Sequence, residues 1–173
     1  MKLVIVINGM GGVGKDTLCQ MAEKAYRTLN VSSITPIKEL ARQCGWTGEK
    51  TDKARKFLAD LKALTVAYND YPTTWLKYQY EAFLKGNDEV MFVHIREPEE
   101  IAKFVSVTGG AAKTLLIRGG ARMAQRGAYG NRADDEVEAY SYDYYFTNDK
   151  PLDKVEPLFL AALEKMMQDA SGK

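Results

Sequence analysis

The chain is short of cysteine and of long apolar runs, and each shortage excludes a class of protein. Its 173 residues include two cysteines, Cys19 and Cys44, which are too few and too far apart for a disulfide framework or a zinc site. The longest apolar runs are too short to span a membrane, and the five apolar residues after Lys2 are too few for a signal peptide. We therefore expect a soluble, cytoplasmic protein with no membrane partner and with both cysteines reduced.

A strong charge of either sign is also missing. The formal net charge is +1 at pH 7, so no broad basic surface argues for a nucleic-acid partner. Repeats, low-complexity tracts and an obvious linker are absent, and 46% of the residues are hydrophobic. This composition predicts one domain over residues 1–173 with a sizeable core. The oligomeric state stays open between a monomer and a homodimer.

The most informative segment is a glycine-rich loop that follows a short apolar run. Residues 3–7 are Leu-Val-Ile-Val-Ile, and residues 9–17 read Gly-Met-Gly-Gly-Val-Gly-Lys-Asp-Thr. The phosphate-loop pattern is glycine, four free positions, glycine, lysine, and then serine or threonine. Only Asp16 departs from it, because it stands where the hydroxyl residue is expected. The pattern predicts a site for a nucleoside triphosphate, and a glycine-rich turn without a ligand is the alternative.

The chemistry of phosphate binding explains these residue types. Glycine lets the backbone turn its N–H groups toward a phosphate at little steric cost, and a helix that starts after the loop adds free N–H groups and a partial positive charge. Lys15 supplies a cation for the outer phosphates, and Asp16 offers an oxygen ligand to a metal ion. We expect ATP and Mg²⁺, with Asp16 as the metal ligand. The predicted nucleotide-binding residues are Gly9, Met10, Gly11, Gly12, Val13, Gly14, Lys15, Asp16 and Thr17.

Hydrophobic periodicity divides the chain into alternating strands and helices. The predicted strands are residues 3–7, 31–36, 90–95, 114–117 and 142–147. The predicted helices are residues 15–29, 37–44, 51–68, 74–84, 97–104 and 151–168. Such alternation favours a parallel sheet with helices on both faces. The predicted fold class is therefore α/β, a three-layer α/β/α P-loop NTPase with a five-stranded parallel sheet.

Polar residues stand where these predicted strands end. Asn8 follows the first strand, and Asn148 follows the fifth. His94 and Arg96 end the third strand, and Arg118 follows the fourth. Ligands of parallel sheets collect at the carboxyl ends of the strands. Two arginines beside a phosphate loop favour contacts with an anionic substrate.

Three arginines follow the fourth strand at intervals of four residues. One helix through them would place three like charges on one face, which is mildly destabilising without a partner. Arginines can neutralise a transferring phosphoryl group, and the glycines around them predict a lid over residues 119–132. The alternative is a solvated basic face paired with the acidic residues at 134–138. The predicted catalytic residues are Lys15, Arg118, Arg122 and Arg126.

A largely helical insert over residues 37–86 separates the second and third strands. Thr51 is placed to cap its longest helix, whose predicted apolar face is Phe57, Leu58, Leu61 and Leu64. The insert is rich in lysine, arginine, tyrosine and tryptophan. Cations can clamp a monophosphate and an aromatic ring can stack on a base, so we expect the phosphate acceptor here. Surface charge and ordinary core packing are the alternative explanations.

Several of these segments resemble one enzyme family. The Gly-Lys-Asp-Thr of the loop is similar to that of bacteriophage and bacterial deoxynucleoside monophosphate kinases, as are residues 36–41, Pro-Ile-Lys-Glu-Leu-Ala. Further similar segments are residues 53–58, Lys-Ala-Arg-Lys-Phe-Leu, residues 94–96, and a closing segment over residues 130–149. The resemblance implies that Lys38 and Arg55 face the acceptor monophosphate, Arg96 the substrate side and Arg118 the transferring phosphates.

One residue departs from that family. His94 stands where the family has an acidic residue that helps to hold the water of Mg²⁺, and an imidazole cannot replace a carboxylate there. A lone histidine is usually structural.

Taken together, the loop, the arginines and the resemblance predict transfer of the γ-phosphoryl group of ATP to a nucleoside or deoxynucleoside monophosphate. A kinase for another small metabolite and an ATP-binding protein without transfer activity are the alternatives.

Overall fold

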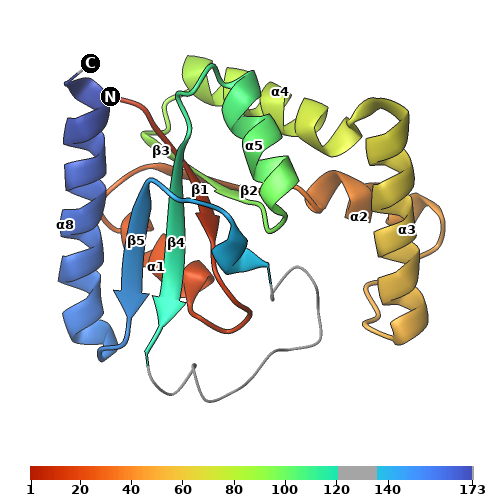
Figure 1. The fold of residues 1–173 in the computed structure, drawn as a ribbon, viewed down its shortest axis with the longest axis horizontal. Helices are drawn as coiled ribbons and strands as arrows, with labels where there is room; N and C mark the ends of the chain where they lie inside the picture. The colour runs from red at the N-terminus through yellow and green to blue at the C-terminus, as the bar shows by residue number, and fades with distance from the viewer. Residues whose placement is uncertain (121–135, 173) are drawn as a thin grey trace.

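Helices and strands alternate along most of the computed structural model, which describes residues 1–120 and 136–172 (Figure 1). The elements in the first half are β1 (Leu3–Asn8), α1 (Lys15–Glu23), β2 (Thr28–Ser32), α2 (Thr35–Gln43), α3 (Asp52–Asn69) and α4 (Tyr71–Lys85). The elements in the second half are β3 (Val90–His94), α5 (Pro98–Val107), β4 (Lys113–Gly119), a 3-10 turn η1 (Val137–Ala139), β5 (Tyr144–Asn148) and α8 (Leu152–Ser171). The lid residues, with Arg122 and Arg126, fall largely within 121–135 and lie outside the described residues.

The five strands form one parallel sheet in the order β2-β3-β1-β4-β5. The central strand β1 pairs with β3 and β4, so that Ile7 lies beside His94 and Asn8 beside Leu116. Because the strands are parallel, their carboxyl ends meet at one edge of the sheet, which we call the carboxyl rim. The phosphate-loop segment leaves β1 at this rim.

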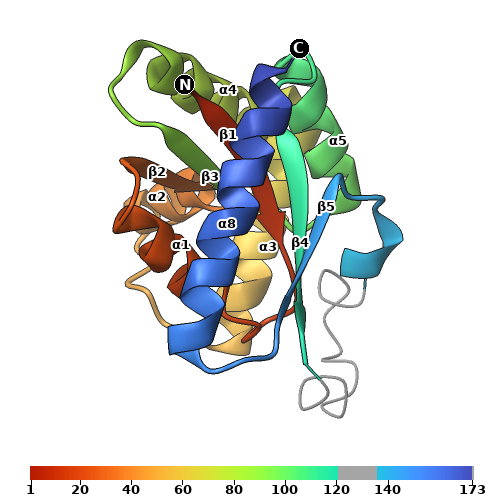
Figure 2. The same cartoon turned by 90° about the vertical axis from the view of Figure 1, so that its left-hand side faces the viewer.

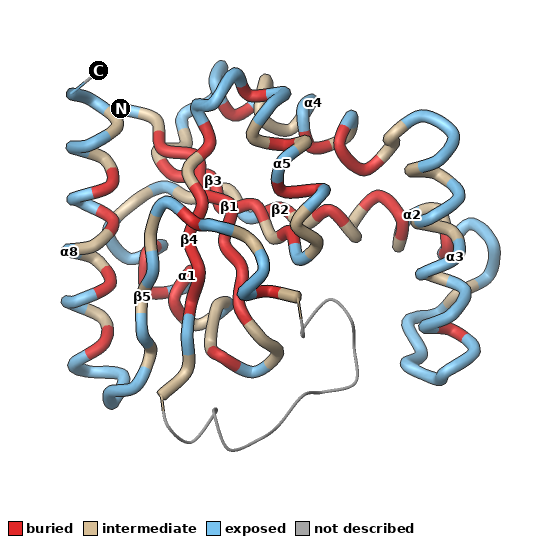
Figure 3. The backbone as a smooth tube through the Cα atoms, viewed as in Figure 1, coloured by how far each residue is buried: buried red, intermediate tan, exposed pale blue. Residues whose placement is uncertain are grey.

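The side chains of β1 point alternately to two hydrophobic clusters. Leu3, Ile5 and Ile7 pack with residues of α1 and α8, whereas Val4 and Val6 pack with residues of α4 and α5. Figure 2 shows α8 running across one face of the sheet, and Figure 3 shows that the central strands are buried. The predicted three-layer α/β/α arrangement is confirmed.

The first helix and the second strand differ from their predicted bounds. The helix ends at Glu23 instead of residue 29, and β2 covers Thr28–Ser32 instead of residues 31–36. Pairing with β3 decides this, because the backbone from Thr28 to Ser32 matches Val90 to His94. The backbone N–H of Glu89 also donates to the carbonyl of Arg27 at 2.7 Å. The residues after β2 then enter α2, where Pro36 occupies the first turn.

Three helices, α2, α3 and α4, lie between β2 and β3. The predicted cap of α3 is present, since Thr51 Oγ1 accepts a hydrogen bond from the backbone N–H of Ala54 at 3.2 Å. The predicted apolar face of α3 is partly wrong, because Phe57 and Leu64 are 36% and 68% exposed. Helix α3 packs against α2 and α4 along one side, and the other side faces solvent (Figure 3).

Candidate nucleotide-binding site

The loop between β1 and α1 accepts no side chain at two of its glycines. A Cβ atom on Gly9 would lie 2.5 Å from the carbonyl oxygen of Ile117, and one on Gly14 would lie 2.6 Å from Asn148 Nδ2. Gly12 and Gly14 also have φ angles of 78° and 93°, in the left-handed region that favours glycine. The bare backbone is therefore required by the surrounding strands as well as by its own turn.

Helix α1 presents its amino terminus to the loop. Its N-cap residue, Gly14, has no side chain that could cap the first turn, so the first N–H groups remain available to an anion. Asp16 lies exposed in that first turn, where the helix dipole favours a negative charge. The arrangement can hold phosphate oxygens on backbone N–H groups with a carboxylate beside them.

The Lys15 side chain folds back over the loop. Its Nζ donates to the carbonyl oxygens of Gly9 at 2.5 Å and of Met10 at 3.1 Å. The ammonium group thus lies over the backbone that the phosphate-loop pattern assigns to the outer phosphates. This position suits a cation that moves from carbonyl oxygens to phosphate oxygens.

His94 ends β3 and faces α1. Its Nε2 lies 3.9 Å from the Sγ of Cys19. Burial lowers the pKa of His94, although the nearby Asp16 carboxylate opposes this effect, so the imidazole is neutral at pH 7. Burial also raises the pKa of Cys19 to about 12, so its thiol stays protonated. Neither group supplies the negative charge that a carboxylate at this position would bring to Mg²⁺.

Arg118 lies in β4 and is bound to an acidic residue of η1. Its Nε and one terminal nitrogen contact the two carboxylate oxygens of Glu138 at 3.0 and 2.8 Å. Its guanidinium also lies 4.5 Å from the centre of the Tyr145 ring. Arg118 pairs with Thr147 of β5, so its predicted place at the end of the fourth strand is confirmed. The pair with Glu138 matches the acidic partner in the alternative explanation, and a contact of Arg118 with phosphate stays a prediction.

The residues predicted to bind the acceptor come from three places. Lys38 is half-buried on α2, Arg55 is exposed near the start of α3, and Arg96 is exposed just after β3. Arg55 lies two turns before Lys62 on nearly the same side of α3, since seven residues turn the helix by about 700°. Lys62 contacts residues that follow β3, so this side of α3 faces the carboxyl rim.

A half-buried ion cluster joins α3 to the segment after β3. Lys62 Nζ lies 3.0 Å from Glu97 Oε2 and 2.9 Å from Glu100 Oε2, the second contact being an ion pair without the geometry of a hydrogen bond. Burial, together with the hydrogen bond to Glu97, raises the pKa of Glu100 to about 7, although the Lys62 ammonium opposes this shift. The carboxylate of Glu97 is thus paired with Lys62.

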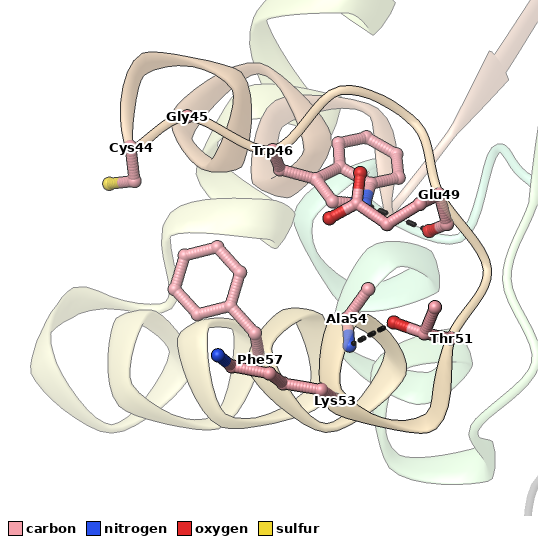
Figure 4. Close-up of a pocket in the computed structure, with 8 residues that line it drawn as sticks. All are labelled: Cys44, Gly45, Trp46, Glu49, Thr51, Lys53, Ala54 and Phe57. Carbon is pink, nitrogen blue, oxygen red and sulfur yellow. Dashed lines mark hydrogen bonds between the residues drawn. The ribbon is translucent and has the colours of Figure 1, made fainter.

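A cavity of about 300 Å³ lies inside the insert (Figure 4). Trp46 and Phe57 line it, together with Lys53 and the exposed Cys44. Figure 4 shows the Phe57 ring pointing into the space between α3 and the loop that precedes it. Lys53 is nine residues before Lys62, so the two side chains project from the axis of α3 in directions about 180° apart. The cavity therefore lies on the side of α3 opposite to Lys62 and Arg55.

Metal ligands are few around the loop. Within residues 1–120 and 136–172, no three His, Cys, Asp or Glu side chains are grouped as a metal site. Asp16 and Thr17 offer oxygen atoms at the start of α1, and Mg²⁺ commonly keeps several waters beside one or two protein ligands. The donor set therefore fits Mg²⁺ bound together with phosphate. No helix in the described part of the chain is long and apolar enough to cross a membrane.

Comparison with known proteins gives matches among solved structures. Neither the known protein families nor the curated proteins contain a match. The tunicamycin resistance protein of Deinococcus radiodurans superimposes with a TM-score of 0.56 at 13% identity, covering 94% of this chain and 96% of that one. Shikimate kinase from Aquifex aeolicus superimposes with a TM-score of 0.51 at 12% identity, covering 94% and 96%. A gluconokinase from Sinorhizobium meliloti superimposes with a TM-score of 0.50 at 15% identity, covering 97% and 94%.

The chain has the fold of P-loop kinases. At such low identities the likeness establishes the fold alone, and it does not test the resemblance to deoxynucleoside monophosphate kinases. Within this P-loop kinase fold, the glycine-rich segment occupies the turn from β1 into α1, which is the structural context that its motif requires.

Sequence reasoning missed part of the support of this loop. Asn148 Nδ2 donates to the carbonyl of Val13 at 2.9 Å, and the buried Asn8 bonds the N–H of Gly9 at 2.8 Å. Both asparagines were recognised only as polar residues at strand ends. Tyr142, which accepts a hydrogen bond from Asn8 at 2.8 Å, was recognised only through its place in an aromatic segment and in the closing segment that resembles the kinase family.

Proposed function

We propose that this protein transfers the γ-phosphoryl group of ATP, with Mg²⁺, to a nucleoside or deoxynucleoside monophosphate. The observation that carries the proposal is the loop after β1, where two glycines admit no side chain and Lys15 lies across the backbone. Arg118 and Arg96 belong to the same carboxyl rim. A cation and two arginines around a phosphate cradle suit charge neutralisation during phosphoryl transfer.

On this proposal the loop residues divide the work of holding ATP. The N–H groups of the loop and of the first turn of α1 hold the phosphates, and Lys15 moves from the loop carbonyls to the outer phosphate oxygens. Asp16 and Thr17 hold Mg²⁺, which when bound neutralises charge on the phosphates. Arg118 reaches the transferring group by exchanging the carboxylate of Glu138 for phosphate oxygens.

The acceptor supplies its own nucleophile. An oxygen of the acceptor monophosphate forms a bond to the γ-phosphorus, and the bond from that phosphorus to the β–γ bridging oxygen breaks, which leaves ADP. A phosphate oxygen is already anionic, so no general base is needed. Lys38, Arg55 and Arg96 are the proposed contacts of the acceptor, and the lid arginines Arg122 and Arg126 are proposed to act beside Arg118.

A different small metabolite is the second candidate acceptor. Two of the similar structures are a gluconokinase and a shikimate kinase, so the same fold carries other acceptors. ATP binding without transfer is the third possibility, and the neutral His94 favours it because it weakens the expected metal site.

A coupled assay of ADP release separates the three possibilities. The purified chain is tested with MgATP against all nucleoside and deoxynucleoside monophosphates, and against gluconate and shikimate. We expect turnover with one or a few monophosphates. Turnover with a metabolite alone would overturn the proposed acceptor, and silence across the monophosphates despite measurable ATP binding would overturn the proposed transfer.

The acceptor side is tested by Arg55→Ala. We expect the KM for the accepted monophosphate to rise about tenfold, the effect of losing one charge-assisted contact, while the KM for ATP stays constant. Lys56→Ala is the matched control, because Lys56 is an exposed neighbour paired with Asp60. Equal changes in both KM values would argue against a phosphate clamp at Arg55.

A further inference from the structure

Asn8 is the last residue of β1, and its side-chain amide forms hydrogen bonds with groups that surround the loop at the carboxyl rim. Asn8 is fully buried. Its Oδ1 accepts from the N–H of Gly9 at 2.8 Å, and its Nδ2 donates to the carbonyl of Arg96 at 3.0 Å and to the Tyr142 hydroxyl at 2.8 Å. A reversed amide would set N–H groups against the N–H of Gly9, so the network allows one orientation.

The Tyr142 hydroxyl completes the network on the other side. It accepts from Asn8 and donates its proton to the carbonyl of Val137 at 2.8 Å. Burial raises the pKa of Tyr142 to about 12, so the hydroxyl keeps this proton at neutral pH. The ring is 5% exposed and packs edge-on against Tyr140 and Tyr145. A hydroxyl fixed by a buried ring and by Val137 gives Asn8 a rigid partner.

The segment that holds Asn8 also holds Arg118. The backbone N–H of Tyr142 donates to the Tyr145 hydroxyl at 3.1 Å, and the Arg118 guanidinium lies over the Tyr145 ring. Glu138, which binds Arg118 through both oxygens, directly follows Val137. One short stretch of chain therefore sets both the start of the phosphate loop and the resting place of the rim arginine.

We propose that Tyr142 is a positioning residue of the nucleotide site, whose hydroxyl acts through Asn8 to fix the backbone of Gly9 where the phosphate loop begins. The inference rests on the proposed function only in taking the loop to bind nucleotide phosphates. It assigns to Tyr142 no contact with the nucleotide. The ligand whose affinity depends on Tyr142 is a nucleoside diphosphate or triphosphate bound to the loop.

Tyr142→Phe tests the proposal because it removes one oxygen and keeps the ring. Tyr144→Phe is the matched control, since the Tyr144 hydroxyl bonds Asp169 on α8 at 2.9 Å. Titration calorimetry with MgADP reports binding without any need for the acceptor. We expect Tyr142→Phe to weaken MgADP binding about five- to tenfold, the size of one lost buried hydrogen bond, and Tyr144→Phe to leave it within about twofold.

A double-mutant cycle shows whether Tyr142 acts through Asn8. In the Asn8→Ala background we expect Tyr142→Phe to change MgADP affinity by less than about twofold. Equal effects of Tyr142→Phe in both backgrounds would overturn the proposed route. Unchanged MgADP affinity in Tyr142→Phe would overturn the positioning role itself.

Amide hydrogen exchange supplies a readout that needs no ligand. We expect faster exchange at the Gly9 N–H in Tyr142→Phe than in Tyr144→Phe, with similar exchange in the strands of both variants. Equal exchange at Gly9 in the two variants would overturn the proposal. The assay across acceptors judges phosphoryl transfer separately, because silence there leaves the MgADP result standing.

Discussion

At the scale of single residues, the loop depends on one lysine that lies across its backbone. We predict that Lys15→Ala lowers the turnover number at least about 100-fold, because the variant loses a cation that neutralises charge on the transferring phosphate. Lys24→Ala is the control, since Lys24 stands at the other end of α1 and pairs with Glu156 on the surface. Steady-state kinetics with MgATP and thermal melts of both variants check this. Turnover retained in Lys15→Ala would contradict the assigned role.

The residue that ends β3 bears on the proposed Mg²⁺ site. His94 is neutral and lies near Asp16. We predict that His94→Asp lowers the Mg²⁺ concentration for half-maximal activity about fivefold, because it adds a negatively charged oxygen ligand beside Asp16. His94→Asn, which adds no charge, serves as the control, and Asp16→Asn should shift the Mg²⁺ requirement the opposite way. A Mg²⁺ titration that gives the same midpoint for His94→Asp and His94→Asn would refute the assignment.

At the scale of elements, the cluster of Lys62, Glu97 and Glu100 ties α3 to α5 and makes stability depend on pH. Glu100 has a pKa of about 7 in the folded chain against an ordinary 4.5, so the folded state keeps a proton that the unfolded chain releases. The contribution of Glu100 to the free energy of unfolding therefore falls as pH rises from about 4.5 to about 7 and is constant above pH 7. The pKa of Glu97 is lowered, so Glu97 acts in the opposite direction below this window.

Glu100→Gln removes that proton linkage. We predict that the stability of the variant relative to the wild type rises by on the order of 2 kcal/mol between pH 4.5 and 7. Urea unfolding of both proteins at several pH values measures the difference. Glu99→Gln, a substitution of an exposed neighbour in the same helix turn, should leave the pH dependence unchanged. Parallel pH profiles for the wild type and Glu100→Gln would show that Glu100 does not titrate in this range.

At the scale of the whole molecule, α8 closes one face of the sheet. Phe159 is fully buried there, with its ring 5.2 Å from that of Phe146 on β5. We predict that Phe159→Ala lowers the free energy of unfolding by about 3–5 kcal/mol, the usual cost of deleting a buried ring. The next residue provides the control, since Leu158 is 48% exposed and its change to alanine should cost about 0.5 kcal/mol. Urea unfolding that gave similar values for both variants would contradict this account of the core.

Local sequence patterns were enough to predict the loop, the alternation of strands and helices, and the three layers. The turn from β1 into α1 is encoded by neighbouring residues, because glycine angles and a helix start depend on short-range sterics. The burial of every residue of β1 is likewise a property of any strand between two helical layers. For the same reason, the Thr51 cap of α3 could be expected from the sequence.

Pairing between distant segments had to come from the tertiary structure. Pairing with β3 sets the bounds of β2 at Thr28–Ser32. The fold also brings Glu138 to Arg118, which the sequence had placed only at the end of a strand. The bond from Asn8 to Tyr142 joins residues 134 positions apart, a separation over which no periodicity operates. The sequence by itself determined the glycine-rich turn from β1 into α1, because that turn is local. Only the tertiary structure decided what holds that loop in place, because those contacts form when the sheet assembles.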